Sequence, residues 1–267
     1  MHELNSKIVE AVRNKYGVEP YVFEKMSWGY NSTTFYLEGL VGSQKVRYAV
    51  KLSNLSKKRL ESLKKDLFFA EFLSDVAKTP KYVKNRQGEF LTVVGQTVIK
   101  VSEMVDGIPP FDMNFDIFKQ VLEVLKRVHT HKLPSIKLEV IDEGTNLLHC
   151  DLTPSNVFVS HGNVVGITDF EFVCIGLVEY DIAKSVVFCW YSMWYKGKGP
   201  SFKEVFKKAT QNYKNLDEEK LKKYALFHAK HFLEDIKKHK ESYADQNYWK
   251  YRYDFAKERL KDLRTTI

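Results

Sequence analysis

The chain has 267 residues, of which 44% are hydrophobic and 28% are charged, and its formal net charge at pH 7 is +8. This length and apolar content allow one or two buried cores, which excludes a disordered chain and a fibre. Lysine and glutamate are mixed along the chain without long blocks of one sign, so we interpret the charge as solvated helix faces and do not expect nucleic acid as a partner.

The cysteines and the apolar runs of the sequence indicate where in the cell the protein is expected. The three cysteines include no C-x-x-C pair, which argues against a disulfide framework and a structural zinc site. Residues 1–20 carry charges throughout and have the apolar spacing of an amphipathic helix, unlike a signal peptide. The longest apolar run, residues 186–195, is shorter than the roughly 20 residues of a membrane-spanning helix. The sequence therefore predicts a soluble, cytoplasmic protein without a membrane partner.

Strand patterns dominate residues 21–55 and 89–105. Within the first of these regions, alternate apolar residues share one face of a strand and Lys51 lies on the other face. The apolar face consists of Val46, Tyr48, Val50 and Leu52. Between the two regions, residues 56–77 are predicted to form a helix with a core stripe. That stripe consists of Leu60, Leu63, Leu67, Ala70 and Leu73.

After residues 106–110 the pattern becomes helical, and residues 147–172 carry the only strand signal. The predicted helices span residues 114–131, 178–195, 202–213, 217–240 and 244–264. We therefore predict an α+β protein in which residues 1–105 form a small strand-rich part and residues 106–267 form a larger, mostly helical part.

The strand signal in residues 147–172 has the form of a hairpin. Val157–Ser160 and Val164–Thr168 are two short β-runs around a turn at residues 161–163. If the chain folds back near Gly162 and Asn163, Asn156 and Asp169 lie equally far from the turn, so we expect them side by side. Amide and carboxylate oxygens at such a place suit Mg²⁺ held through phosphate oxygens.

The same stretch matches H-x-D-x-x-x-x-N followed by D-F-x, the catalytic-loop and metal-binding pattern of kinase-type phosphoryl transfer. In this match Asp151 stands five residues before Asn156, in a loop where Pro154 opposes a helix. A surface hairpin with ordinary turn residues is the alternative. The four polar residues at these spacings favour the phosphotransfer site.

A site of this type requires a lysine on a strand, and Tyr48-Ala49-Val50-Lys51 has the form of the V-A-I-K motif. A glycine-containing hairpin at residues 27–33 precedes it, although an ordinary turn explains a single glycine equally well. An acid on the following helix should pair with Lys51. Asp66 and Glu71 are the candidates, and periodicity does not choose between them.

Three segments resemble the hallmarks of the aminoglycoside phosphotransferase and choline kinase family of small-molecule kinases: HCDLTPSN at 149–156, DFE at 169–171 and EYDIA at 179–183. The resemblance covers nearly the whole chain, with residues 101–107 corresponding to the hinge between two lobes. It implies a bilobal protein-kinase-like fold with ATP in the cleft. The N-lobe would cover the nucleotide, and the C-lobe would hold the catalytic loop and the substrate site.

The resemblance also implies roles for individual residues. Asp151 would orient or deprotonate the substrate hydroxyl, while Asn156 and Asp169 would hold Mg²⁺. Asp181 would tie down the catalytic loop, and His149 would be a packing and hydrogen-bonding residue of that loop. The residues expected to bind the nucleotide or support its site are Gly29, Asn31, Ala49, Lys51, Asp66, Glu71, Glu103, Met104 and Val105.

The phosphate acceptor is less well specified. Only eleven residues lie between Asp169 and Asp181, too few for the activation segment that positions peptides in protein kinases, so a small molecule is favoured. Residues 201–267 hold 17 Lys and Arg against 11 Asp and Glu, which argues against polycationic aminoglycosides. The aromatics of residues 188–195 and 248–253 offer faces to choline-like cations or sugar rings, although core packing of two amphipathic helices is the favoured explanation.

We therefore predict an ATP- and Mg²⁺-dependent phosphotransferase acting on a hydroxyl of an amino alcohol, amino acid, sugar or aminoglycoside-like molecule. The alternatives are a kinase acting on protein Ser/Thr and a catalytically silent nucleotide-binding module. The presence of Lys51, Asp151, Asn156 and Asp169 disfavours the silent module. The sequence does not decide between ATP and GTP, and it does not indicate the oligomeric state.

Overall fold

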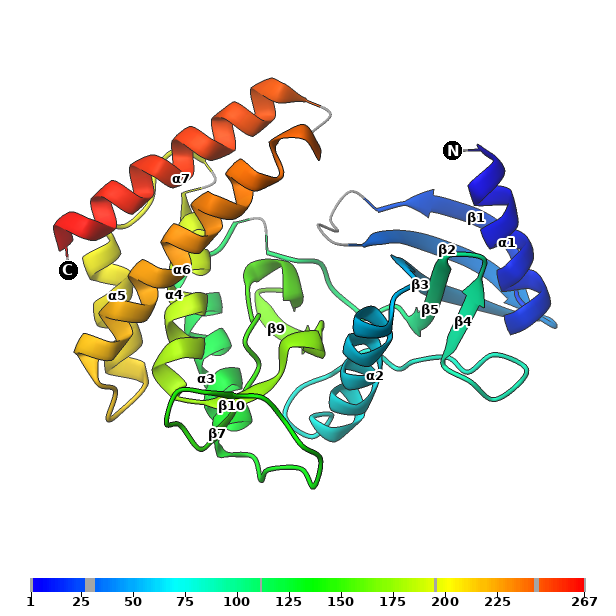
Figure 1. Cartoon of the computed structure of the whole chain (residues 1–267), viewed down its shortest axis with the longest axis horizontal. Coiled ribbons are helices and arrows are strands. Elements are labelled where there is room, and N and C mark those ends of the chain that lie inside the picture. The colour runs from blue at the N-terminus through cyan, green and yellow to red at the C-terminus, as the bar shows by residue number, and fades with distance from the viewer. Residues whose placement is uncertain (1, 27–31, 111, 195, 243–244, 267) are drawn as a thin grey trace. The chain divides into compact units, whose positions relative to one another are not determined.

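The structure, a computed structural model, describes residues 2–26, 32–110, 112–194, 196–242 and 245–266. The chain divides into two compact units (Figure 1). The first unit comprises Met1–Asp106 and Gly166–Glu171, and the second comprises Gly107–Val165 and Phe172–Ile267. The sequence placed a boundary at 105/106 and did not indicate that Gly166–Glu171 cluster with the N-terminal part. The predicted glycine hairpin, with Gly29 and Asn31, lies outside the described residues.

The first unit is built on a five-stranded antiparallel sheet with the strand order β1-β2-β3-β5-β4. Its strands are β1 Glu19–Lys25, β2 Thr33–Val41, β3 Gln44–Asn54, β4 Leu91–Val94 and β5 Thr97–Glu103. Two helices complete the unit, α1 His2–Tyr16 and α2 Lys57–Phe72. In Figure 1 the blue helix α1 runs along the sheet.

One face of this sheet forms a core with α1. Ile8 and Val12 of α1 pack with Val50 and Leu52 of β3, and Val46 and Tyr48 lie against the same cluster. The predicted apolar face of β3 is therefore confirmed. Because side chains alternate along a strand, Lys51 projects from the opposite face, where the antiparallel register makes it the partner of Lys100 on β5.

Helix α2 begins where Ser56 caps it, accepting a hydrogen bond from the backbone N–H of Arg59 at 3.1 Å. It ends at Phe72, five residues before the predicted end at residue 77. The next residues include Ser74 and Asp75, whose short polar side chains compete with the helical backbone for hydrogen bonds.

The second unit is mostly helical, as the sequence predicted. Its helices are α3 Phe115–Thr130, α4 Val178–Met193, α5 Phe202–Asn212, α6 Glu218–Lys238 and α7 Gln246–Thr266. A small sheet with the order β6-β10-β7 was not predicted in full. Its strands are β6 Val140–Ile141, β7 Asn146–Leu148 and β10 Cys174–Gly176, which are too short for an alternating pattern to register.

The predicted hairpin is present as β8 Val157–Ser160 and β9 Asn163–Ile167. His161 and Gly162 at its tip have φ of 50° and 76°, as a tight two-residue hairpin turn requires. Asn156 ends a short 3₁₀ helix before β8, and Asp169 follows β9. Because Asn156 belongs to the second unit and Asp169 to the first, their placement side by side stays a prediction.

Helix α4 forms the centre of the second unit. It packs against α3, α5 and α6, and its buried residues include Trp190. Among the described residues, no helix combines the length and the apolar character needed to cross a membrane.

His228 of α6 packs against Tyr180 of α4. The two rings meet edge to face with centroids 4.6 Å apart, and His228 Nε2 lies 3.0 Å from the Tyr180 carbonyl oxygen. Burial, with a smaller contribution from the charge of Lys184, lowers the pKa of His228 to about 3. The unfolded chain therefore takes up a proton at His228 below about pH 6.5, whereas the folded chain does not.

We predict that the low pKa of His228 in the folded chain makes the folded state less stable as the pH falls. Between about pH 6 and about pH 4, the free energy of unfolding of the native chain should drop more steeply than that of His228→Gln, by up to about 1.4 kcal/mol per pH unit. Glutamine keeps an N–H donor for the Tyr180 carbonyl but does not titrate. Urea unfolding at several pH values measures both slopes, and equal slopes would contradict the prediction.

Candidate functional site

The loop that carries Asp151 is anchored by α4. Asp181 accepts hydrogen bonds from the backbone N–H groups of His149, at 2.7 Å, and Cys150, at 2.9 Å. One turn further along α4, Ser185 Oγ donates to the Leu152 carbonyl at 2.6 Å. The prediction that Asp181 ties down this loop is therefore confirmed. His149 is fully buried, and its Nδ1 accepts from the backbone N–H of Asp151 at 3.3 Å.

Asp181 is itself held as a charged acceptor. Burial alone raises the pKa of Asp181, but the hydrogen bond and charge of His129, together with His149, outweigh burial and leave the pKa below its ordinary value. His129 Nε2 lies 3.1 Å from Asp181 Oδ2, and His129 Nδ1 lies 2.8 Å from the Tyr213 hydroxyl. An ionised carboxylate is a stronger acceptor for the two backbone N–H groups than a neutral acid.

Cys150 shows why the loop needs this anchor. Its φ is 63°, in the left-handed region that residues other than glycine rarely adopt. The backbone on both sides of this strained residue is fixed, because its N–H donates to Asp181 and its carbonyl accepts from Lys184 Nζ at 2.8 Å. The loop therefore holds Asp151 in one defined place.

Both carboxylate oxygens of Asp151 have partners. Lys184 Nζ lies 2.6 Å from Oδ1, and Asn156 Nδ2 donates to Oδ2 at 2.9 Å. The same Asn156 nitrogen donates to the Asp151 carbonyl at 2.8 Å. Since both amide hydrogens of Asn156 face Asp151, the oxygen of that amide is the end left for another ligand.

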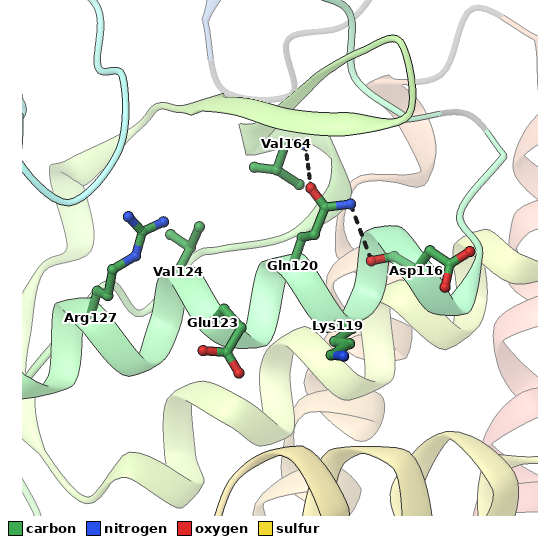
Figure 2. A pocket seen from close by; sticks show the side chains of 7 residues that line it. All are labelled: Asp116, Lys119, Gln120, Glu123, Val124, Arg127 and Val164. Carbon is green, nitrogen blue, oxygen red and sulfur yellow. Dashed lines mark hydrogen bonds between the residues drawn. The ribbon is translucent and has the colours of Figure 1, made fainter.

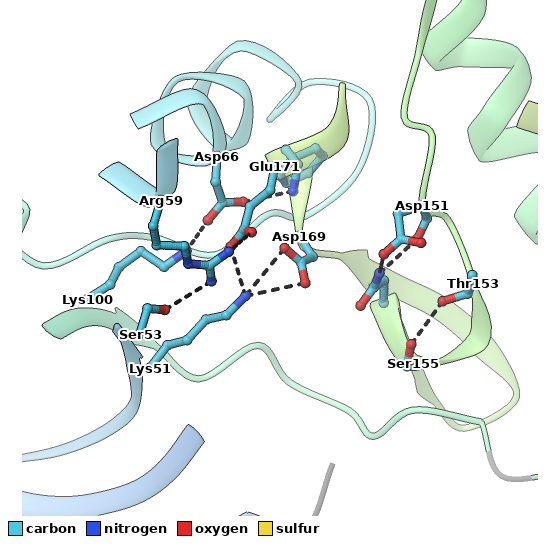
Figure 3. A network of polar contacts seen from close by, with 12 residues as sticks. Lys51, Ser53, Arg59, Asp66, Lys100, Asp151, Thr153, Ser155, Asp169 and Glu171 are labelled. Carbon is cyan, nitrogen blue, oxygen red and sulfur yellow. Dashed lines mark hydrogen bonds and ion pairs between the residues drawn. The ribbon is translucent and has the colours of Figure 1, made fainter. Parts of the chain in front are cut away.

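The first unit contains a second polar network, formed around Lys51 (Figure 3). Lys51 Nζ lies 3.3 Å from Asp169 Oδ2 and 3.1 Å from Glu171 Oε1. Arg59 of α2 makes an ion pair with the other oxygen of Glu171 and donates to Ser53 Oγ at 3.0 Å. Burial alone would lower the pKa of Lys51, but the acids around it outweigh burial and raise the pKa, so the amine stays charged.

The expected partner of Lys51 was wrong. Lys51 forms its ion pairs with Asp169 and Glu171, whereas Asp66 forms an ion pair with Lys100 and Glu71 lies on the exposed surface. Lys100 is itself almost fully buried, and a buried ammonium requires an acid beside it. The alternation Val98, Lys100, Ser102 along β5 is the sequence signal for this inward lysine.

Asp66 has a role that the sequence did not show. Its Oδ1 accepts from the backbone N–H of Phe170 at 2.8 Å, and its Oδ2 accepts from the Tyr82 hydroxyl at 2.5 Å. Burial alone raises the pKa of Asp66, but the charges of Lys100 and Lys51 and its hydrogen bonds outweigh burial and lower it. The preceding residue, Asp169, has a left-handed φ of 70°. Asp66 therefore fixes the backbone directly after Asp169.

The remaining residues predicted to support nucleotide binding lie in the first unit. Ala49 stands on β3 opposite Ser102, and Glu103 ends β5. The Met104 backbone N–H donates to the Arg47 carbonyl at 3.2 Å. Val105 packs so closely on Gly166 that a Cβ there would lie 2.7 Å from Val105 Cγ1. Their roles in nucleotide binding stay predictions.

A separate hollow of about 380 Å³ lies on α3 beside β9 (Figure 2). Gln120 bridges the two elements, since its Oε1 accepts from the Val164 N–H at 2.8 Å and its Nε2 donates to the Gly162 carbonyl at 3.1 Å. None of the predicted site residues lines this hollow. Its lining is Asp116, Lys119, Gln120, Glu123, Val124, Arg127 and Val164.

The aromatic residues considered for cation binding belong mainly to the helical core. Trp190 is almost fully buried, and Tyr191 is in ring contact with Phe232 and Phe255. Several of the more exposed rings are covered by the chain's own cations. These pairs are Arg259 over Trp194 at 3.9 Å, Lys240 over Trp249 at 4.9 Å, Lys237 over Tyr253 at 5.7 Å and Arg252 over Tyr248 at 5.9 Å. This arrangement favours packing over a choline-type cage.

We predict that the Asp66–Lys100 pair is essential to the first unit. Lys100→Met leaves the buried Asp66 carboxylate without its main counter-charge and should lower the free energy of unfolding by about 3–5 kcal/mol. Urea unfolding measures this loss. Lys250→Met, which removes an exposed pair with Asp254, is the control and should leave stability unchanged. A Lys100→Met chain as stable as the control would contradict the prediction.

Comparison with known proteins gives both sequence and fold relationships. Residues 118–224 match the family model described as phosphotransferase enzyme family. A stretch of 36 residues is 56% identical to a homoserine kinase of Gluconacetobacter diazotrophicus. That stretch covers 14% of this chain and 11% of the homoserine kinase.

Solved structures match over nearly the whole chain. A microcompartment-associated aminopropanol kinase has a TM-score of 0.70 at 14% identity, with 96% of this chain and 95% of that chain covered. A spectinomycin phosphotransferase in complex with ADP and spectinomycin has a TM-score of 0.66 at 11% identity, with 98% of each chain covered. An ethanolamine kinase of Plasmodium vivax has a TM-score of 0.64 at 14% identity, with 99% of this chain and 90% of that chain covered.

These matches confirm the α+β, kinase-like fold and the resemblance seen in the sequence. Residues 118–224 thus match the phosphotransferase enzyme family model, and over nearly its whole length the chain shares the fold of the aminopropanol kinase and ethanolamine kinase structures.

Proposed function

We propose that this protein transfers the γ-phosphoryl group of Mg²⁺-bound ATP to a hydroxyl group of a small molecule. The observation that carries the proposal is the Asp151 carboxylate, fixed on a strained loop by Lys184 and Asn156 in a chain with a small-molecule kinase fold. Phosphoryl transfer requires little covalent chemistry from the protein. It depends on the positioning of reactants and on stabilisation of charge.

Asp151 is the residue that receives the proton of the acceptor hydroxyl. Each carboxylate oxygen has two lone pairs, so Oδ1 and Oδ2 can accept a further hydrogen bond beyond those from Lys184 and Asn156. The acceptor oxygen must lie within about 2.6–3.2 Å of this carboxylate. Fixing the carboxylate in advance lowers the entropic cost of reaching that geometry.

Asn156 and Asp169 are the residues that would hold the metal ion. The free oxygen of the Asn156 amide and the Asp169 carboxylate are hard oxygen ligands of the kind that Mg²⁺ takes. When bound, Mg²⁺ would neutralise charge on the nucleotide phosphates. A Mg²⁺ site completed by phosphate and water does not require a cluster of three acidic, histidine or cysteine side chains, and the described residues contain none.

Lys51, which belongs to the first unit, would pair with the phosphates of the nucleotide. Its ammonium is kept charged by Asp169 and Glu171, and Arg59 holds Glu171 in place. A permanently charged lysine on a strand is the group that pairs with nucleotide phosphates in kinase-type sites.

The segment after Asp169 supports a small acceptor. The 3₁₀ helix Phe170–Phe172, strand β10 and the first turn of α4 occupy most of the eleven residues before Asp181. With eleven residues, this segment is too short to be the activation segment that positions peptides in protein kinases. Homoserine, aminopropanol and ethanolamine, the compounds named for the related kinases, are the first acceptors to examine.

The test is ADP release from Mg²⁺-ATP in the presence of single acceptors. The panel contains homoserine, aminopropanol, ethanolamine, choline, spectinomycin, hygromycin B, simple sugars and a generic peptide. Release that depends on one small molecule supports the proposal. Phosphorylation of the peptide alone would replace it with a protein kinase, and tight ATP binding without any transfer would indicate a silent module.

We predict that two substitutions separate the roles of the carboxylates. Asp151→Asn should lower kcat by at least about 10²-fold and leave the affinity for Mg²⁺-ATP nearly unchanged, because only proton transfer is lost. Asp169→Ala should instead weaken nucleotide binding in the presence of Mg²⁺. Calorimetric titration of ATP with and without Mg²⁺ measures the binding, and equal loss of affinity in both variants would refute this division.

A further inference from the structure

Three side chains on one face of helix α4 bond to the catalytic loop, at residues 149–152. Asp181, Lys184 and Ser185 stand at positions i, i+3 and i+4, which lie next to one another on a helix. They contact the loop in order along the chain, from the N–H groups of residues 149 and 150 to the carbonyl of residue 152. The helix therefore fixes the conformation of the loop.

Lys184 differs from the other two in what it touches. Within the loop, Asp181 and Ser185 bond to backbone atoms, whereas Lys184 also reaches the side chain of Asp151. Its Nζ lies 2.6 Å from Asp151 Oδ1 and 2.8 Å from the Cys150 carbonyl oxygen. Residues 151–156, with the sequence DLTPSN, contain no lysine or arginine of their own. Lys184 thus brings positive charge to a loop that lacks it.

The position of Lys184 places its charge near the reacting atoms. An acceptor oxygen bonded to Asp151 lies within about 3.2 Å of the carboxylate, so the Lys184 ammonium can be no more than about 8 Å from that oxygen. The side chains of Lys184 and Asp151 are 21% and 23% exposed, so solvent screens the interaction only in part. An ammonium group has three N–H donors, and two of them serve Asp151 and Cys150.

We propose that Lys184 is a second functional lysine of the transfer reaction, acting through Asp151. It holds the Asp151 carboxylate in the orientation that receives the acceptor proton. It also offsets negative charge while the bond from the acceptor oxygen to the γ-phosphorus forms and the bond from that phosphorus to the β–γ bridging oxygen breaks. ADP leaves with the bridging oxygen, and the acceptor proton passes to Asp151. This inference rests on the proposed function.

A role as a loop anchor alone is the competing explanation, because Lys184 also donates to the Cys150 carbonyl. The two explanations differ in what charge does. An anchor requires only a hydrogen-bond donor, which glutamine supplies, whereas a functional cation requires positive charge, which arginine retains. The two roles are therefore separable by substitution.

The experiment compares Lys184→Met, Lys184→Gln and Lys184→Arg in the ADP-release assay, together with thermal unfolding. We expect Lys184→Met and Lys184→Gln to lower kcat by about 10²-fold while KM for Mg²⁺-ATP changes less than about 2-fold, because Lys51 and the metal residues are untouched. Lys184→Arg should have a kcat at least about 10-fold higher than that of Lys184→Met. Lys222→Met is the matched control, since Lys222 has a similarly exposed side chain (29%) and pairs with Glu219 on α6.

Each other outcome overturns the inference. Native kcat in Lys184→Met would show that the charge is not used, while inactivity of Asp151→Asn in the same assay would leave the proposed function standing. A glutamine variant as active as the native chain would reduce Lys184 to a loop anchor. If the native chain transfers phosphate neither to any acceptor nor to water, the proposed function fails and the inference fails with it.

Discussion

The bonds from the backbone N–H groups of His149 and Cys150 to the Asp181 carboxylate are the interaction on which the rest of the site depends. They hold a residue with a left-handed φ directly before Asp151, and without a charged acceptor that conformation would relax. Asp181 is oriented in turn by His129 of α3, and His129 by Tyr213 at the end of α5. The packing of α3, α4 and α5 thus determines where the Asp151 carboxylate lies.

Both units fix the backbone at a residue with a left-handed φ, but they do so through different elements. In the second unit, a helix supports a strained loop through side chains at successive positions. In the first unit, Asp66 of α2 bonds the N–H that follows the left-handed residue Asp169, and its charge is balanced by Lys100. In both cases a buried carboxylate accepts the backbone N–H beside a strained residue. A loop that would otherwise sample many conformations is thereby given one.

The sequence predicted the parts of this arrangement that depend on local spacing. Asp151, Asn156 and the hairpin were recognisable because a motif and a turn specify them within a short stretch. The partners of these residues were not recognisable, since Lys184 is 33 residues from Asp151 and Lys100 meets Asp66 through strand register. Amphipathic helices were predicted to within a few residues, whereas β6, β7 and β10 are too short for a period to show.

The charges around Lys51 have a consequence for the proposed binding of a nucleotide. Three cations and three anions form this network: Lys51, Arg59 and Lys100 against Asp66, Asp169 and Glu171. Its formal charge is therefore zero, so the phosphates of a free nucleotide would meet no surplus of positive charge there. The positive charge that balances the phosphates would therefore have to come with the nucleotide, as a bound cation. In the proposed function, this balance would favour a polyphosphate that already carries its counter-ion over a bare one.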